Sequence, residues 1–486
     1  MVVQHNLQAM NANRMLNVTT GQQAKSTEKL SSGYKINRAA DDAAGLTISE
    51  KMRKQIRGLD QASTNAQDGV SSVQTAEGAL TEVHSMLQRM NELAVQASNG
   101  TNAESDRQAI QDEINQLTTE IDRVAETTKF NEIYLLKGDS EGGTKTEKLA
   151  AHDAGLAGTL VDNGDKATFT AKALKHGEQI NIAGKSYTVE GIKGPTTNSI
   201  SQGTAGVAGV NGTYEFDLTG MSALMNEKAT FTINGTDYTI DVEKGDTTDK
   251  IGAKLKTAID GKIDDGLNTK YAVAYAGGKL TFTAGTAGAG NAAVTGSFKG
   301  AVENGTSVTD IYNKMKDELA TASSIGTDTA ATVTNTDGTF TITKGSVEVA
   351  KSLSFNLHVG ADADLTNKIN VNIETMNSAY LGIKNLNVTD KTGTAATYSV
   401  DAIADAVAKV SAQRSALGAV QNRLEHTIDN LDNVVENTTS AESRIRDTDM
   451  AEEMVNYSKN NILAQAGQSM LAQANQSTQG VLSLLQ

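Results

Sequence analysis

The stretch LDQASTNAQDGVSSVQTAEGALTEVHSMLQRMNELAVQA, residues 59–97, carries an unbroken apolar pattern. Apolar or small residues recur in it at alternating steps of three and four, which is typical of a helix that packs along partner helices. The seam positions are Leu59, Ala62, Ala66, Gly69, Val73, Ala76, Leu80, Val83, Leu87, Met90, Ala94 and Ala97. This pattern predicts one helix of about 58 Å, and the small residues in its first half predict a neighbouring backbone close against it.

Two further stretches carry the same kind of stripe. One holds Ile110, Ile114, Leu117, Ile121 and Val124. The other holds Ile403, Ala406, Val410, Gln413, Leu417, Val420, Leu424, Thr427, Leu431 and Val434. Because a lone amphipathic helix cannot bury such a stripe, we expect these three helices to pack on one another. The N- and C-terminal thirds of the chain are then one helical domain.

The middle of the chain is rich in glycine and is predicted to form β-structure. Of the 44 glycines, 31 lie between Gly138 and Gly345. Residues 230–240 alternate apolar and polar side chains around a central Asn-Gly pair, which is a strong hairpin signal. A last alternating stretch, 353–373, predicts a hairpin that returns to the helical domain. We therefore predict an α + β fold, with β-rich domains inserted into a long helical coiled-coil or bundle core that both chain ends build.

The pieces of the middle recur. Two sets of four residues match at a constant offset of 51 positions. They are Ile180, Ile182, Gly184 and Tyr187 in the first copy and Phe231, Ile233, Gly235 and Tyr238 in the second. Short amphipathic helices are predicted at 251–259 and 311–319, and each precedes a further hairpin. We expect two or three copies of a hairpin/helix unit and, from them, two subdomains.

Composition excludes several classes of protein. The absence of Cys excludes disulfide scaffolds and thiol catalysis. A net charge of −15 argues against a nucleic-acid binder. No apolar run approaches the ~18 residues that a membrane span needs, so no membrane partner is expected. The start of the chain lacks the basic and apolar segments of a cleaved secretory signal.

The sequence also lacks motifs for catalysis. The six His are scattered, without a pair at metal-ligand spacing. Lys185 stands in a Gly-Lys-Ser triplet like the end of a phosphate-binding loop, but Gln179 occupies the position that requires the first Gly. Asp41 and Asp42, next to Arg38, fit a helix N-cap with an ion pair better than an acid–base pair. We predict no cofactor, no metal and no enzyme activity.

The C-terminal segment 454–486 carries a single charge, Lys459. Its apolar face consists of Leu463, Met470, Leu471, Ala474, Val481, Leu482 and Leu485. A terminal helix of a monomer normally wears charges on its solvent side. The segment is therefore either buried within a monomer or, as we favour, packed against other copies of the chain.

Long motifs stand at both ends of the chain. They read EKLSSGYKINRAADDAAGL (28–46), ISEKMR (48–53), IRGL (56–59), LGAVQNRLE (417–425), AESRIRDTDMA (441–451), NILAQ (461–465) and MLAQANQ (470–476). These motifs resemble bacterial flagellin, in the style of Gram-positive anaerobes, over roughly residues 1–137 and 351–486. The resemblance implies a structural subunit that polymerises into the flagellar filament for swimming motility.

The same resemblance implies a layered subunit. The inner layer of the filament is a terminal coiled coil formed by residues 1–42 and 452–486. Around it lies a helical bundle with a β-hairpin, formed by residues 43–137 and 351–451. The variable, β-rich outer region consists of residues 138–350. We expect the outer region to be dispensable for polymerisation. Subunit packing is assigned to the C-terminal apolar face above, together with Arg38, Asp41 and Asp42.

By resemblance, the partners are other copies of the chain, a flagellar export chaperone, the filament cap and hook-junction proteins. The chain is expected to leave the cell through the flagellar export system and to become part of the extracellular flagellum. A hook–filament junction protein or another hook-associated protein has similar ends and is the alternative. An unrelated secreted adhesin on a coiled-coil stalk is a more remote one.

Flagellins also resemble one another in the stretch that the Toll-like innate receptor of animal hosts reads. The matching residues here are Gln88, Arg89, Glu92, Leu93 and Gln96, with Glu113 on the next helix. Arg89, Glu92 and Leu93 fall outside the heptad seam, so they are free to face solvent or a partner. The alternative is that this face serves subunit packing alone.

Overall fold

The computed structural model describes residues 6–206, 211–262, 267–285, 293–299 and 305–483. The chain divides into two compact units, each assembled from separate stretches. The first comprises Met1–Glu77, Ser354–Asn372 and Ser415–Gln486, and the second comprises Gly78–Leu353 and Ile373–Arg414. Two long helices, α2 (Ala43–Ser98) and α8 (Thr394–Arg446), contribute residues to both.

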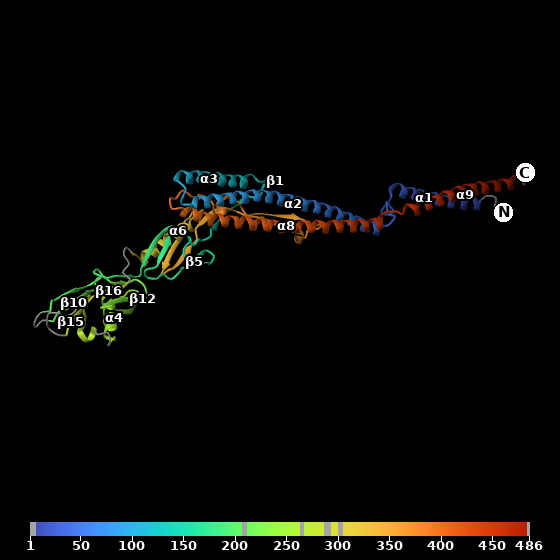
Figure 1. Cartoon of the computed structure of the whole chain (residues 1–486). Helices are drawn as coiled ribbons and strands as arrows, with labels where there is room; N and C mark the ends of the chain where they lie inside the picture. Colours follow the sequence, from blue (N-terminus) through green and yellow to red (C-terminus); the bar gives the residue numbers. More distant parts are fainter. Residues whose placement is uncertain (1–5, 207–210, 263–266, 286–292, 300–304, 484–486) are drawn as a thin grey trace. The chain divides into compact units, whose positions relative to one another are not determined.

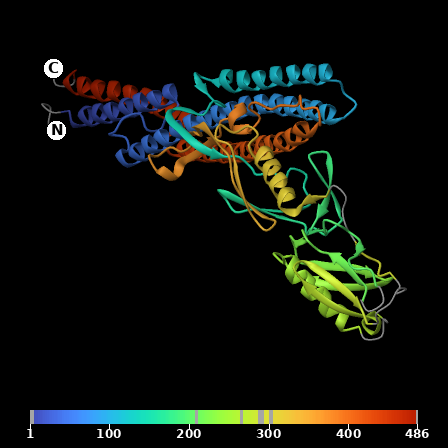
Figure 2. The ribbon, with the colours of Figure 1, turned by 90° about the vertical axis from the view of Figure 1, so that its left-hand side faces the viewer.

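The first unit consists of helices and one hairpin. Helices α1 (Leu7–Ser32) and α9 (Met450–Ser483) lie side by side (Figures 1 and 2). Helix α1 ends at Gly33, whose φ of 77° is left-handed and favours glycine. Strands β21 (Leu353–His358) and β22 (Lys368–Ile373) pair, with the 3-10 turn η1 (Leu365–Asn367) between them. The predicted hairpin at 353–373 is confirmed.

In this unit, the small side chains of α2 allow the hairpin and α8 to pack closely against it. Ala66 is buried with Ile369 of β22 and Leu424 of α8. A Cβ on Gly69 would lie 2.2 Å from Leu357 Cδ1 and 3.3 Å from Leu424 Cδ1. The predicted close approach along the first half of the seam is confirmed, because both neighbours occupy the volume that a larger side chain would need.

The helical part of the second unit is tightly packed. The α2 seam residues Leu80, Val83, Leu87, Met90, Ala94 and Ala97 are fully buried. Buried residues of α3 (Glu104–Thr127) and of the start of α8 include Ile110, Ile114, Ile121, Ile403, Ala406 and Val410. The short helix α7 (Ser378–Leu381) is held by Asp122 of α3, whose carboxylate accepts hydrogen bonds from Ser378 N and Oγ at 2.7 and 2.8 Å. The predicted stripes are confirmed as largely buried helix faces, with Leu117 and Val124 half-buried, but Val434 at the end of the α8 stripe is 42% exposed, which corrects the prediction there.

Short strands and two β-bodies with separate cores follow α3. The strands outside the bodies are β1 (Lys129–Phe130), β2 (Ile133–Tyr134), β3 (Asp139–Lys148) and β20 (Ser346–Lys351). The first body holds β4 (Gly158–Asp162), β5 (Lys166–Ala171), β6 (Gln179–Ile182), β7 (Lys185–Glu190), β17 (Thr306–Ser307), α6 (Val308–Ala322), β18 (Thr332–Thr336) and β19 (Thr339–Thr343). Its sheets have the strand orders β18-β19-β5-β4 and β17-β7-β6.

The second body holds β8 (Ile192–Lys193), β9 (Ile200–Gln202), β10 (Thr213–Asp217), β11 (Ser222–Ala223), β12 (Glu227–Ile233), β13 (Thr236–Val242), α4 (Thr248–Asp260), α5 (Leu267–Lys270), β14 (Tyr271–Ala276), β15 (Lys279–Ala284) and β16 (Gly296–Lys299). Its larger sheets have the orders β14-β15-β10-β9 and β13-β12-β16. Figure 1 shows α4 beside these strands.

Both bodies use the same succession of hairpin, helix and hairpin. In the first body these are β6–β7, α6 and β18–β19, and in the second they are β12–β13, α4 and β14–β15. The turn residues Asn234 and Gly235 have φ of 49° and 83°, as the predicted Asn-Gly hairpin requires. The hairpin/helix repeat predicted from the sequence is therefore confirmed.

The first body and the ribbon β3–β20 are joined to the helices of their unit by packing. Val347 and Val349 of β20, together with Leu149, which follows β3, pack against Ala379 and Tyr380. Tyr398 of α8 is buried in the core of the first body and donates a hydrogen bond of 3.0 Å to Glu318 Oε2. Removal of all of 138–350 would therefore uncover Tyr380 and Tyr398, whereas the second body has a core of its own.

Excision of the second body alone is expected to leave polymerisation intact. Glu190 at the end of β7 pairs with Ser307 of β17, so residues 191–305 can be replaced by a short glycine linker. We expect a critical concentration for assembly within about twofold of the wild type, the change that ~0.4 kcal/mol corresponds to. Sedimentation and electron microscopy measure the critical concentration, and the larger deletion of residues 138–350 serves as the comparison. If the variant without residues 191–305 formed only monomers, the second body would be shown to hold the filament together.

Candidate assembly interface

The pair α1/α9 buries very little of its own surface. Among the side chains that the structure describes in these helices, only Ser26, Asn460 and Ala464 are buried. The two helices are in contact at Gly467 and Leu16. A Cβ built on Gly467 would lie 3.4 Å from Leu16 Cδ1. The pair therefore lacks the closed seam that α2 has in the second unit.

Large apolar side chains of α1 and α9 are instead exposed. They are Leu7, Met10, Met15, Val18, Met450, Met454, Val455, Ile462, Leu463 and Met470, with exposed fractions from 47% for Leu463 to 70% for Leu7. A groove of about 720 Å³ runs between the helices and is lined by Met15, Leu16, Leu463, Gly467 and Met470, among others. Apolar surface of this extent on a soluble subunit marks a face that a partner covers.

The predicted packing residues occupy different positions on this pair. Leu463 and Met470 are exposed, whereas Leu471 and Ala474 are half-buried. The carbonyl of Ala474 accepts a hydrogen bond of 3.1 Å from Asn6 Nδ2. The side chains of Val481 and Leu482, and Leu485 as a whole, lie outside the described part of the chain. Their assignment to subunit packing stays a prediction.

The connection between α1 and α2 is held by the two adjacent aspartates. Asp42 Oδ1 accepts hydrogen bonds from Ala44 N and Gly45 N at 3.1 and 2.9 Å, which caps α2 as predicted. Asp41 Oδ2 accepts a hydrogen bond of 2.9 Å from Arg38 N, and this bond lowers the pKa of Asp41 below its usual value. Both carboxylates thus serve the backbone rather than an acid–base reaction.

The predicted ion pair of Arg38 with these aspartates is wrong. Arg38 Nε lies 3.0 Å from Glu28 Oε1 on α1, and the cation nearest to Asp41 is Lys25, at 4.0 Å. The physical reason is that Asp41 and Asp42 are engaged by backbone N–H groups, so the guanidinium finds the free carboxylate of the preceding helix instead. The pairing depends on how the chain turns back beside α1.

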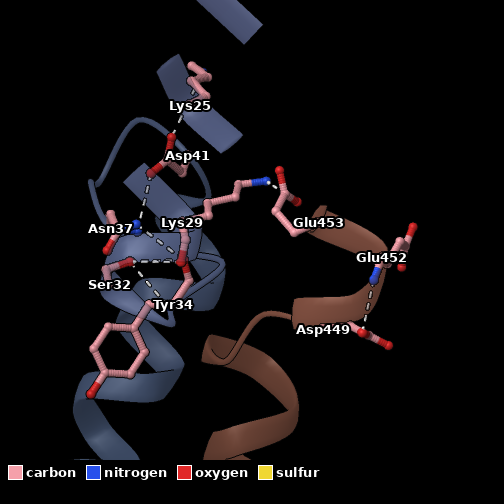
Figure 3. Close-up of polar contacts among 9 residues, drawn as sticks. All are labelled: Lys25, Lys29, Ser32, Tyr34, Asn37, Asp41, Asp449, Glu452 and Glu453. Carbon is pink, nitrogen blue, oxygen red and sulfur yellow. Dashed lines mark hydrogen bonds and ion pairs between the residues drawn. The ribbon is translucent and has the colours of Figure 1, made fainter. Parts of the chain in front are cut away.

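Contacts at the start of α9 tie the two chain ends together. Figure 3 shows Lys29 of α1 reaching across to Glu453 of α9, with Nζ 3.7 Å from Oε2. Asp449 caps α9, because its Oδ1 accepts hydrogen bonds from Ala451 N and Glu452 N at 2.9 and 3.1 Å. An Asp before a helical stretch is a recognisable cap signal, so Asp449 can be found from the sequence, whereas no local pattern indicates the ion pair of Lys29 with Glu453.

A backbone clasp lies next to this ion pair. Lys35 N donates to Arg446 O at 2.7 Å and Thr448 N donates to Gly33 O at 3.0 Å, so that Tyr34 and Asp447 form an antiparallel bridge. The Arg446 guanidinium lies 4.8 Å from the centre of the Tyr34 ring. No local sequence pattern announces this clasp, since its halves are some 400 residues apart.

The receptor-type residues form a separate patch on α2 and α3 in the second unit. Arg89 Nε lies 2.9 Å from Glu113 Oε1, and its Nη1 lies 3.1 Å from Glu92 Oε2. Gln88 and Gln96 are exposed beside them. The structure therefore brings five of the six predicted residues to one exposed surface, with Arg89 half-exposed.

Leu93 corrects the prediction. It is 2% exposed, so it is a core residue and is not available to a receptor. The physical reason is that α2 has neighbours on more than one side here, so the buried stripe extends beyond the two heptad positions. Val95, three positions after Glu92 on the same helix, is 52% exposed.

Family models match both ends of the chain. The bacterial flagellin N-terminal helical region matches residues 3–141, and the C-terminal helical region matches residues 400–485. The flagellin of Clostridium tyrobutyricum is 39% identical, over 99% of this chain and 100% of that protein. The chain belongs to the bacterial flagellin family.

Other flagellins match this flagellin over similar lengths. That of Halalkalibacterium halodurans is 32% identical over 100% of both chains, and that of Salmonella typhimurium is 35% identical over 96% of this chain and 97% of its own. A solved flagellar hook associated protein-3 from Legionella pneumophila covers 82% of this chain and 98% of its own, at 14% identity and a TM-score of 0.31.

Membership of the family establishes what this flagellin does. It is a structural subunit that polymerises into the extracellular flagellar filament, the organelle of swimming motility. The full-length relatives named above, at 32–39% identity, are themselves flagellins, which favours the filament subunit over the hook-associated alternative. Within the described ranges, none of the helices has the length and apolar character needed to cross a membrane.

Proposed function

We propose that α1 and α9 form the principal assembly interface of this flagellin, and that they bury their exposed apolar side chains against α1 and α9 of neighbouring subunits. The observation that carries the proposal is the exposed apolar set on this pair, in helices with few charges. Burial of one such side chain contributes roughly 1.5–3 kcal/mol, so ten of them supply a large driving force for assembly. The polar Gln and Asn side chains between them tolerate contact with water or with another helix.

The same proposal assigns the layers of the filament. The coiled coil of 1–42 with 452–486 is innermost, the bundle and hairpin of 43–137 with 351–451 surround it, and 138–350 faces outward. Burial in the single subunit supports this order, since the seam of α2 from Ala62 to Ala97 and that of α8 from Ile403 to Leu431 are largely buried, whereas α1 and α9 leave their apolar side chains exposed. A filament interior is where an open apolar pair finds partners on all sides.

Cysteine cross-linking tests this interface directly, because the natural chain has no Cys. Met470→Cys, exposed on α9, is expected to form disulfide-linked dimers when filaments are oxidised and to remain monomeric when dilute subunits are oxidised. Val161→Cys, equally exposed on β4, is the matched control and is expected to stay unlinked in both. Non-reducing gels give the readout. Equal cross-linking of the two variants in filaments would contradict the proposed interface.

Further roles follow from the family resemblance. We propose export through the flagellar secretion system, with an export chaperone, the filament cap and hook-junction proteins as partners. We also propose that the subunit is purely structural, without enzyme activity. The patch of Gln88, Arg89, Glu92, Gln96 and Glu113 is proposed to bind the host Toll-like receptor for flagellin, because these side chains form one exposed, charged surface.

A further inference from the structure

Helix α8 carries a stripe of exposed acidic residues in the first unit. Glu425, Asp429, Asp432 and Glu436 are spaced by four, three and four positions, which places them on one face over about 17 Å. None of these carboxylates forms an ion pair with a lysine, arginine or histidine that the structure describes; Asp432 accepts a hydrogen bond of 3.1 Å from Ser63 Oγ, and Glu425 one of 2.9 Å from Gln421 Nε2. Like charges one turn apart destabilise a helix, so the stripe is unfavourable in the isolated subunit.

Helix α2 of the same unit carries the opposite charge. Lys51, Lys54 and Arg57 are exposed and, among the described residues, have no acidic partner within ion-pair distance. Two of the acids near them are already engaged: Glu50 pairs with Arg446 at 2.9 Å, and Glu442 pairs with Arg53 at 3.6 Å. Asp60, one turn after Arg57, is exposed, so this face keeps a local excess of positive charge in a chain with a net charge of −15.

The first part of α2 and the last part of α8 lie side by side (Figures 1 and 2). Even so, the acidic stripe of α8 and the basic face of α2 form no ion pair with each other among the described residues. We propose that the acidic stripe of one subunit docks on the basic face, Lys51, Lys54 and Arg57, of a neighbouring subunit in the filament. The inference rests on polymerisation and adds a second, electrostatic contact to the apolar interface of α1 and α9.

A second copy of this chain is the partner that the charges fit. In a homopolymer every subunit brings both faces, so one heterologous contact neutralises one acidic and one basic face per subunit and repeats along the assembly. The complementary charges also set the orientation in which subunits meet, since the opposite juxtaposition brings like charges together.

Charge reversal tests the contact. The acidic-stripe variant Glu425→Lys/Asp429→Lys/Glu436→Lys leaves Asp432 in place because of its bond to Ser63. The basic-face variant is Lys51→Glu/Lys54→Glu/Arg57→Glu. Each is expected to raise the critical concentration for assembly about tenfold or more at low salt, with a smaller effect at high salt. The variant Glu141→Lys/Asp241→Lys/Glu348→Lys has the same net charge as the acidic-stripe variant but is expected to assemble like the wild type.

An equimolar mixture of the two reversed variants decides the question. Each variant then finds the opposite charge only on the other, so the mixture is expected to assemble near the wild-type concentration. Assembly of either reversed variant alone at the wild-type concentration would overturn the inference. A variant that carries all six substitutions in one chain provides a further test. If this variant assembled while the mixture did not, the inference would also be overturned, because the charges would then act within one subunit. The cross-linking of Met470→Cys tests the α1/α9 interface independently of these variants.

Discussion

Deletion of residues 461–486 is expected to abolish filament formation and to leave the rest of the subunit folded. The deletion removes Ile462, Leu463 and Met470, which are exposed in the subunit and contribute nothing to a closed core. The buried seams of α2, α3 and α8 lie outside it, so the subunit keeps its packing. Assembly instead loses the burial of these three apolar side chains, each worth roughly 1.5–3 kcal/mol, so the loss is comparable to the ~8.2 kcal/mol that corresponds to assembly at micromolar concentration.

Point variants separate interface loss from general damage. Met10→Gln, Met15→Gln and Met470→Gln together change only exposed side chains of α1 and α9 and are expected to raise the critical concentration at least about a hundredfold. Leu365→Gln and Val161→Thr, which replace equally exposed apolar residues elsewhere, are the matched controls. Circular dichroism establishes that each subunit is folded, and electron microscopy scores filaments. Long filaments from the deletion, or equal effects of the control substitutions, would disprove the proposed interface.

Replacing Arg89 with alanine is expected to weaken binding of the monomer to the receptor ectodomain about thirtyfold, as truncation of a hot-spot arginine costs about 2 kcal/mol or more. Arg89 is half-exposed and is held by Glu113 and Glu92, so its guanidinium is positioned before a partner arrives. Preorganisation lowers the entropy that binding must supply. Surface plasmon resonance with the immobilised ectodomain measures the effect.

Arg123→Ala is the matched control for this experiment. Arg123 lies on α3, is similarly exposed, and pairs with Glu120 as Arg89 pairs with Glu92, but lies outside the patch. It is expected to leave the affinity unchanged. Leu93→Ala is a poor probe of receptor binding. Because Leu93 is buried, its truncation would lower the free energy of unfolding by about 2–5 kcal/mol without removing a receptor contact. The receptor assignment fails if the wild type does not bind, or if both arginine variants bind as tightly as it does.

Local sequence patterns were sufficient for the long helices and the repeated hairpins of this fold, but not for strands such as β4, β5 and β10. The heptad seam at 59–97 predicted the buried face of α2, because helix periodicity and burial coincide wherever a helix packs on one main side. The Asn234-Gly235 turn predicted its hairpin, since these residues accept the left-handed backbone that such a turn requires, and Asp337 and Gly338 adopt the same backbone in β18–β19. The repeat was visible for the same reason: each copy is specified by short-range signals.

The contacts between distant segments were decided by the tertiary structure. Leu93 is buried because more than one neighbour covers α2, and its own heptad position does not reveal that. Arg38 pairs with Glu28 instead of Asp41 because backbone amides reach the aspartate first. The clasp of Tyr34 with Asp447 joins segments that are far apart in sequence, so no periodicity encodes it.

For this flagellin, the sequence by itself determined the long helices and the repeated hairpins, the apolar face of each, and that the C-terminal segment is poor in charge. Those properties depend on neighbours within a turn or two of the chain. The tertiary structure alone decided which apolar faces are closed within the subunit and which remain open, as well as which charges are neutralised. Both depend on where separate stretches meet in space: most of the seams of α2 and α8 are buried within the subunit, whereas the apolar side chains of α1 and α9 are left exposed.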